Sequence, residues 1–123
     1  MAQENQVVDI VGGTPLTDHF APLSDRGRRE ILALLGPEGA LTAGAELQAY
    51  AYDGTFLEHR PDLVALPRTT EEVAAILRLA SSERVPVVTR GAGSGLAGGS
   101  VPLAGGIALA LTRMNRIIEL DQI

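Results

Sequence analysis

The chain lacks cysteine, lysine and tryptophan, and only two of its 123 residues are histidine. Without cysteine it has no disulfide, thiolate metal site, iron–sulfur cluster or cysteine nucleophile. His19 and His59 stand too far apart in the sequence to indicate a metal site, so none is predicted. Without lysine the chain cannot form the Gly-Lys-Ser/Thr cradle of P-loop nucleotide-binding proteins.

Long apolar runs and an excess of positive charge are also missing. No run approaches the roughly 20 apolar residues that cross a bilayer, so no membrane span is predicted. The polar, acidic segment Met1–Asn5 is unlike a signal peptide, and we expect a cytoplasmic protein. Fifteen carboxylates against ten basic residues give a net charge of -5, which argues against nucleic acid as a partner.

Glycine, by contrast, is concentrated in one loop, with five glycines between Arg90 and Ser100. Glycine allows positive φ and lets another group lie directly against the main chain. A run of turn amides without side chains forms a concave nest for an anion, usually a phosphate. We therefore predict a diphosphate cradle. The alternative is a tight, mobile surface loop.

Two known motifs do not account for this loop. Gly93, Gly95 and Gly98 match G-x-G-x-x-G, but the dinucleotide fingerprint needs a helix that opens inside the glycines. Residues 98–106 cannot propagate a helix, which excludes a Rossmann interpretation. Ser94 breaks the Gly-x-Ser-x-Gly spacing of a nucleophile elbow, so we interpret it as a turn residue that binds phosphate.

Alternating apolar runs predict a βαβ unit ahead of the loop. Residues 62–67 and 85–89 are the predicted strands, and Thr69 and Glu72 form a capping box for the helix between them. The apolar stripe of this helix consists of Val73, Ile76, Leu77 and Ala80. The strands should be parallel with a right-handed crossover, and the loop should leave the carboxyl end of the second strand, where ligands of such sheets bind.

The segments before this unit give weaker patterns. Residues 1–23 are predicted as a loosely packed arm with a short strand at 7–11. A helix capped by Ser24 or Asp25 should end at Gly36. Its buried side should consist of Ile31, Leu32, Leu34 and Leu35.

Further elements are predicted on both sides of the glycine loop. A second helix is expected at 43–52, with Leu47, Tyr50 and Ala51 on one side. A strand is expected at 107–111, a turn or short helix at 112–116 and the start of another strand at 117–120. A sheet that ends on an unpaired strand is an aggregation hazard. We therefore expect the opening piece of a larger domain, unless the last strand pairs back onto the one before it.

Three segments, 61–73, 84–99 and 112–117, resemble a known family in their order and spacing. They are similar to FAD-linked oxidases with the vanillyl-alcohol-oxidase/para-cresol-methylhydroxylase (PCMH) type of flavin domain. Within this family, the chain most resembles the FAD-binding subunit of glycolate oxidase and the related D-lactate and D-2-hydroxyglutarate dehydrogenases. The resemblance covers residues 41–123. Residues 1–40 precede it and are predicted to form an N-terminal arm and helix.

The resemblance implies an α+β fold, namely the first subdomain of a PCMH-type FAD-binding domain, with a small βαβ-containing sheet and flanking helices. The second subdomain and the cap over the flavin ring have no counterpart in this chain. FAD should bind non-covalently, because Gly93 stands where some relatives have a histidine that tethers it. The full-length protein would oxidise a small 2-hydroxy acid of the glycolate or D-lactate type, with other glycolate oxidase subunits as partners.

The resemblance also implies which residues hold the cofactor. Main-chain amides of 89–95 would wrap the FAD pyrophosphate, and 96–100 would continue toward the flavin. The predicted cofactor-binding residues are Thr89, Arg90, Gly91, Ala92, Gly93, Ser94, Gly95, Leu96, Gly98, Gly99 and Ser100. Two roles stay open for Arg90: it offsets phosphate charge, or it is a solvent-facing strand-end residue without effect. Tyr50 and Asp53 are interpreted as a local helix-end contact.

No catalytic residue is assigned. We expect the isolated chain to bind FAD weakly or not at all and to be catalytically silent. The alternative to a flavoprotein piece is a truncated, non-catalytic fragment or an interaction module with no bound cofactor.

Overall fold

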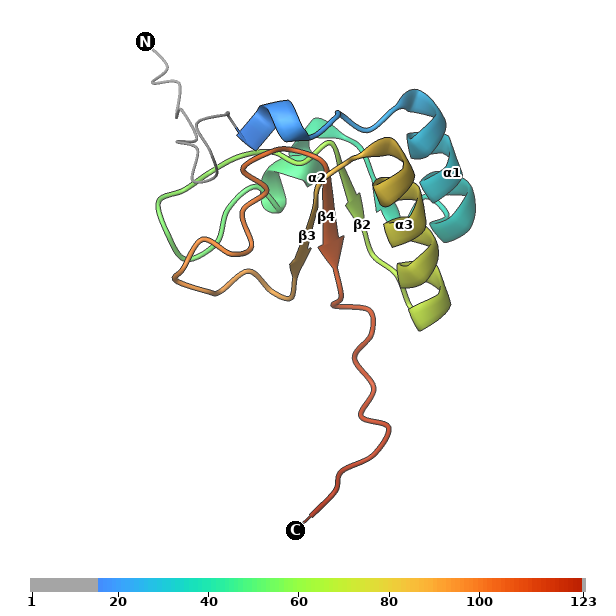
Figure 1. Ribbon diagram of the computed structural model, residues 1–123. Coiled ribbons are helices and arrows are strands. Elements are labelled where there is room, and N and C mark those ends of the chain that lie inside the picture. The colour runs from blue at the N-terminus through green and yellow to red at the C-terminus, as the bar shows by residue number, and fades with distance from the viewer. Residues whose placement is uncertain (1–15, 123) are drawn as a thin grey trace.

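Four short strands form one sheet at the centre of the computed structural model, which describes residues 16–122 (Figure 1). In chain order they are β1 (Ala40–Leu41), β2 (Leu63–Ala65), β3 (Val87–Arg90) and β4 (Ile107–Ala110). The order in the sheet is β1-β2-β4-β3, with β4 parallel to both neighbours and β1 antiparallel to β2. The predicted βαβ unit is confirmed, but β4 lies between its two parallel strands.

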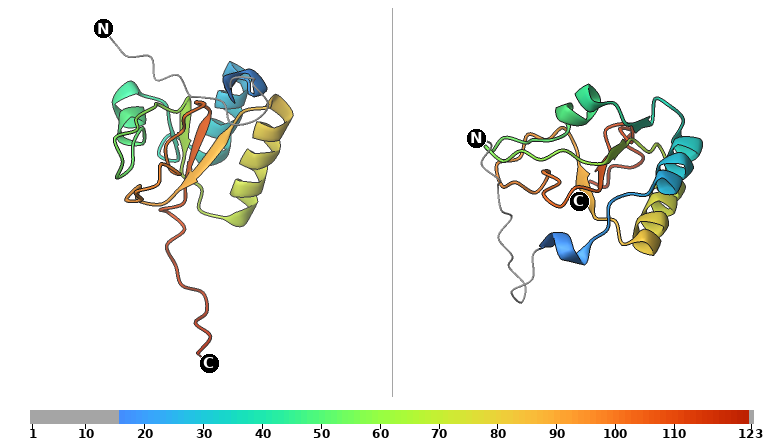
Figure 2. Two further views of the ribbon diagram at one scale, coloured as in Figure 1. Left: turned by 60° about the vertical axis from the view of Figure 1, so that its left-hand side comes forward. Right: turned by 90° about the horizontal axis from the view of Figure 1, so that it is seen from above.

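Helices cover both faces of this sheet (Figure 2). On one face α1 (Asp25–Leu35) and α3 (Thr70–Glu83) lie side by side, and α2 (Gly44–Ala49) lies on the other. Successive strand residues point to opposite faces. Leu63 and Ala65 therefore pack in the core under α1 and α3, whereas Val64 packs on the α2 side. The predicted small α+β fold is confirmed.

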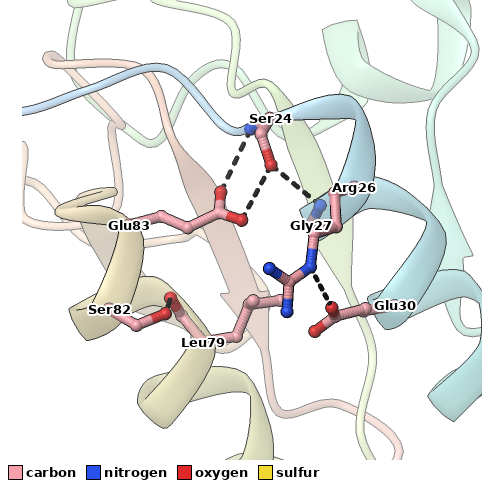
Figure 3. A network of polar contacts seen from close by, with 7 residues as sticks. All are labelled: Ser24, Arg26, Gly27, Glu30, Leu79, Ser82 and Glu83. Atoms are coloured by element: carbon pink, nitrogen blue, oxygen red, sulfur yellow. Dashed lines mark hydrogen bonds and ion pairs between the residues drawn. The ribbon is translucent and has the colours of Figure 1, made fainter.

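A polar network joins the start of α1 to the end of α3, so the two helices run in opposite directions (Figure 3). The Ser24 hydroxyl oxygen accepts from the Gly27 N–H at 2.9 Å, which confirms Ser24 as the N-cap. The same hydroxyl donates to Glu83 at 2.7 Å. A Cβ on Gly27 would lie 2.9 Å from that carboxylate, so glycine allows the two helix ends to approach.

The buried face of α1 is narrower than predicted. Ile31 is buried and Leu35 packs against the core, but Leu32 and Leu34 are 43% and 41% exposed. At about 100° per residue, these two leucines point roughly 80° to either side of the line through Ile31 and Leu35. The predicted end of the helix is confirmed, because Gly36 adopts a φ of 72° and its N–H donates to the Leu32 carbonyl.

The cap of α3 is confirmed, but its predicted stripe is partly wrong. Thr69 Oγ1 accepts from the Glu72 N–H at 3.2 Å, while the Glu72 carboxylate accepts from the Arg68 N–H, one residue earlier than a capping box requires. Leu77 is 44% exposed, whereas Leu79, which the stripe omitted, packs against the core. The cause is α1, which lies on the Leu79 side of α3.

Three short features differ from the predicted pattern. The two-residue strand β1 and a 3-10 turn, η1 (Leu16–His19), were not predicted. The helix α2 ends at Ala49, earlier than expected. The strand expected at 7–11 lies outside the described residues.

The strand expected at 117–120 is wrong. These residues leave the sheet as an extended tail (Figure 1), with Ile117 and Ile118 83% and 87% exposed. β-branched residues favour a strand where a neighbouring strand can form hydrogen bonds with them. Among residues 16–122, no strand pairs with residues 117–120. The predicted turn before the tail is confirmed, and the Arg113 guanidinium fixes it by donating to the Leu66 carbonyl at 3.2 Å.

Candidate functional site

The glycine loop connects two parallel neighbours, β3 and β4. Such a connection carries the chain back along the sheet and usually contains a helix. Residues 91–106 do so without one, with bends and turns only. The exclusion of a Rossmann interpretation is therefore confirmed. The loop leaves the carboxyl end of β3, as predicted (Figure 1).

The first part of this loop, residues 91–97, contacts the rest of the protein through its carbonyl groups rather than its amides. The Ala92 carbonyl accepts from Arg90 Nη2 at 3.3 Å, and the Gly95 carbonyl accepts from the Gly54 N–H at 2.8 Å. Within residues 16–122, by contrast, no N–H of residues 91–97 donates a hydrogen bond to a protein group. Neighbouring amides without protein acceptors are the donors that an anion nest offers.

Arg90 is buried beneath the loop, with 6% of its surface exposed. Its Nη1 donates to the carbonyls of Tyr50 and Tyr52 at 3.0 and 3.2 Å, and its Nη2 donates to that of Ala92. The guanidinium carbon also lies 5.1 Å from the centre of the Tyr50 ring, within cation–π range. The interpretation of Arg90 as a solvent-facing residue without effect is therefore wrong, because its donors bond main-chain carbonyls from two segments.

Asp53 lies next to this arginine and is also buried, at 7% exposed. Its Oδ1 accepts from the Thr55 N–H at 2.8 Å and from the Thr55 hydroxyl at 2.5 Å. The Thr55 hydroxyl is the main cause that lowers the pKa of Asp53, followed by the Thr55 amide. The Gly98 amide and the Arg90 charge lower this pKa further, against the opposing effect of burial. The carboxyl group is thus held ionised.

One oxygen and one nitrogen of these two side chains have no protein partner. Among the described residues, Asp53 Oδ2 and Arg90 Nε are buried without a hydrogen bond. One is an acceptor and the other a donor, and each belongs to a charged group. The two charged side chains are buried where the glycine loop meets the segment that follows α2.

The glycines of the loop divide into two groups by what a side chain would meet. Gly93 has a φ of 76°, and a Cβ there would lie 1.8 Å from Arg90 Nη2. Gly98 has a φ of 77°, and a Cβ there would lie 2.9 Å from a Leu57 methyl group. At Gly91, Gly95 and Gly99 a Cβ would meet nothing within 4 Å, and none of these residues has a positive φ. The fold requires the first group but leaves open space at the second.

The predicted cofactor-binding residues lie together along one continuous segment, from the end of β3 through the loop. Of all of them, only Arg90 has a buried side chain. Leu96 is 81% exposed, and the Ser94 hydroxyl is exposed without a hydrogen-bond partner in the described part of the chain. Their assignment to FAD stays a prediction.

Sequence reasoning missed the segment beneath the loop. A Cβ on Gly54 would lie 2.6 Å from Leu96 Cδ2 and 2.8 Å from the Gly95 carbonyl oxygen, so the two segments pack closely (Figure 1). The available signal was Tyr50-x-x-Asp53 followed by Gly54, interpreted as a helix-end contact and a turn. Its partner, Arg90, lies far along the sequence.

Two other kinds of site find no support in the part of the chain that the structure describes. No group of three or more histidine, aspartate or glutamate side chains there is placed to hold a metal ion. None of the helices between residues 16 and 122 has the length and apolar character needed to cross a bilayer.

The region that contains the glycine loop matches a known protein family. The model of a family described as "FAD binding domain" matches residues 61–123. The chain belongs to this family. The match spans β2, α3, β3, the glycine loop and β4, which are the elements that build and support the candidate site.

Relatives of the chain include a glycolate oxidase subunit and a D-lactate dehydrogenase. The glycolate oxidase subunit GlcD of Bacillus subtilis (strain 168) is 38% identical over 96 residues, which cover 77% of this chain and 20% of that protein. A D-lactate dehydrogenase of Anaerostipes hadrus is 41% identical over 63 residues, or 51% of this chain and 13% of that protein. The predicted resemblance is confirmed.

A solved structure confirms the expected fold type. p-Cresol methylhydroxylase with substrate bound matches with a TM-score of 0.69 and 26% identity, over 78% of this chain and 20% of that one. The chain thus has the fold of the N-terminal part of a PCMH-type FAD-binding domain. It spans about a fifth of the length of the Bacillus relative, and similarly short parts of the others.

Proposed function

We propose that the glycine loop binds the diphosphate of FAD through main-chain amides. One observation carries this proposal: the N–H groups of residues 91–97 donate to no described protein group, while loop carbonyls are held by Arg90 and Gly54. A diphosphate brings the acceptor oxygens that these amides lack, and its charge suits a nest of N–H dipoles. Membership of the FAD-binding family supports FAD as the ligand.

The residues of the loop fit this group. The open space at Gly91 and Gly95 lets phosphate oxygens lie against the main chain. The exposed Ser94 hydroxyl adds a further donor. Residues 91–100 include no histidine, cysteine or tyrosine that would form a bond to the flavin, so the loop itself would hold FAD non-covalently. When bound, the flavin supplies hydride acceptance, which is chemistry of the cofactor itself.

We also propose that the protein works as part of a flavin-dependent oxidoreductase of 2-hydroxy acids, of the glycolate or D-lactate type. The names of its relatives support this class. Hydride transfer needs a substrate carbon about 3–3.5 Å from its acceptor, shielded from water. The loop would hold only the diphosphate end of the cofactor, and neither the cavity between α1 and α3 nor the one lined by residues 113–118 includes a loop residue. We therefore expect no turnover from the 123 residues alone.

Calorimetric titration of the purified chain with FAD, ADP and riboflavin tests the proposal. FAD and ADP share the diphosphate, whereas riboflavin has no phosphate. We expect weak binding of FAD and ADP and none of riboflavin, with all bound FAD released by acid precipitation. Binding of riboflavin but not ADP would place recognition on the flavin ring and refute the diphosphate cradle. Binding of none of the three would favour the interaction module.

A further inference from the structure

The Nη nitrogens of Arg90 donate to protein carbonyls. A buried charge is costly unless hydrogen bonds or an opposite charge compensate it. No carboxylate in residues 16–122 lies within ion-pair distance of this guanidinium. Three carbonyls accept its hydrogen bonds, those of Tyr50, Tyr52 and Ala92, and the charge of the Asp53 carboxylate acts on it from a longer distance. Two of the carbonyls belong to the segment after α2 and one belongs to the glycine loop.

The bond to the Ala92 carbonyl has a consequence for the next amide. The Ala92–Gly93 peptide is trans. In a planar trans peptide the C=O and N–H bonds point in opposite directions. Because Arg90 holds the Ala92 carbonyl, the N–H of Gly93 points away from the guanidinium. That N–H is one of the loop amides that donate to no described protein group.

The guanidinium of Arg90 packs directly against Gly93. A Cβ at Gly93 would lie 1.8 Å from Arg90 Nη2 and 2.7 Å from its Cζ, so the guanidinium lies directly against this glycine. The φ of 76° at Gly93 is a left-handed conformation that side chains disfavour. A side chain at position 93 would therefore have to displace the guanidinium.

We infer that Arg90 is a positioning residue for the diphosphate. Its guanidinium fixes the plane of the Ala92–Gly93 peptide so that the Gly93 N–H faces the phosphate, and it does not itself pair with the phosphate. The inference rests on the proposed function for the identity of the ligand only. Lysine cannot replace arginine here, because a single ammonium cannot reproduce the planar fork that reaches three carbonyls.

The first test uses the wild-type chain. Nuclear magnetic resonance of the labelled protein, at 12.9 kDa, resolves both amides and arginine side chains. We expect discrete Nη–H signals from Arg90 that stay in place when FAD is added, while the Gly93 N–H signal shifts. A large shift of the Arg90 Nε–H signal, whose nitrogen has no partner among the described residues, or of the Nη–H signals with FAD would show direct phosphate pairing and overturn the inference.

The second test compares Arg90→Lys with Arg113→Lys. Arg113 is a matched control, because it also donates to a main-chain carbonyl, that of Leu66, away from the loop. We expect Arg90→Lys to lower the heteronuclear NOE of Gly93 and to weaken FAD binding at least about tenfold, the loss expected for one hydrogen bond to a charged group. Arg113→Lys should change neither. Wild-type affinity in Arg90→Lys would mean that charge, not geometry, is what Arg90 contributes.

The two readouts separate this inference from the proposed function. If the wild-type chain binds no FAD, the proposed function fails, and the NOE of Gly93 in the free variants still decides whether Arg90 orders the loop. If Arg90→Lys does not fold, the wild-type Nη–H signals decide whether the guanidinium bonds the protein or the phosphate. An unchanged NOE in a folded Arg90→Lys variant overturns the inference.

Discussion

Alanine at Gly91 or Gly95 should weaken FAD binding without destabilising the fold. A Cβ at either position would have no protein atom within 4 Å, and neither residue has a positive φ. Replacing glycine by alanine where the backbone permits it raises the free energy of unfolding by about 0.4–1 kcal/mol, because the unfolded chain loses freedom. We therefore expect glycine at these positions to serve ligand binding rather than the fold.

The expected loss of affinity for FAD follows from the same open space beside Gly91 and Gly95. We place the diphosphate against the main chain at these glycines, where an added methyl group would overlap it. Forcing an extra methyl group into a closely packed site costs about 1–3 kcal/mol. This corresponds to a roughly 5- to 150-fold increase in the Kd for FAD. ADP should lose affinity by a similar factor, because it carries the same diphosphate.

Gly93→Ala provides the contrast. Its φ of 76° adds strain of about 1–3 kcal/mol. Displacing the Arg90 guanidinium would leave buried carbonyls unpaired, at about 1–3 kcal/mol. The free energy of unfolding should therefore fall by roughly 2–6 kcal/mol. Gly93→Val should abolish FAD retention altogether.

Urea unfolding followed by circular dichroism measures the stability of each variant, and calorimetric titration measures FAD affinity. The expected pattern is stable but weakly binding Gly91→Ala and Gly95→Ala, and an unstable Gly93→Ala. If both of the first two variants bind FAD like the wild type, the diphosphate does not lie at these glycines. If both lose more than about 1 kcal/mol of stability, the fold itself requires glycine there.

Three further outcomes are expected. Thr69→Ala should lower the free energy of unfolding by about 1 kcal/mol through loss of the α3 cap, with unchanged FAD affinity; a change in affinity without one in stability would make Thr69 a site residue. The folded-state pKa of Asp53 lies below its unfolded value of about 3.9. Its ionisation therefore stabilises the fold above that pH, and this contribution is lost as pH falls from about 4 through the folded value. The stability difference between wild type and Asp53→Asn should shrink on acidification, and a constant difference would contradict the assigned pKa shift. Finally, the chain with FAD should not reduce a dye with glycolate or D-lactate, and substrate-dependent reduction would contradict the absence of turnover.

The sequence was sufficient where the signal is local. Ser24 and Thr69 cap their helices because a hydroxyl before an N-terminus needs only the next turn to act. The strands β2, β3 and β4 follow from short apolar runs bounded by proline or glycine. The irregular glycine loop follows from residues that cannot propagate a helix.

The remaining features depend on contacts between distant segments. Leu77 and Leu79 differ in exposure because α1 packs on one side of α3, which no stripe on α3 alone reveals. Ile117 and Ile118 have high β-propensity, but no described strand pairs with them. Arg90 is buried because carbonyls about 40 residues away in the chain compensate its charge. An isolated strand-end arginine gives no sign of this.

Amide-resolved titration of the wild-type chain with FAD tests the central claim most directly. Proton–nitrogen correlation spectra are recorded as FAD is added, with ADP and riboflavin titrated in parallel. We predict that FAD and ADP shift the amide signals of residues 91–97 and leave those of α1 and α3 in place, while riboflavin shifts none of them. Amide signals of the loop that stay fixed with FAD and ADP, or shifts confined to another part of the chain, would contradict the account.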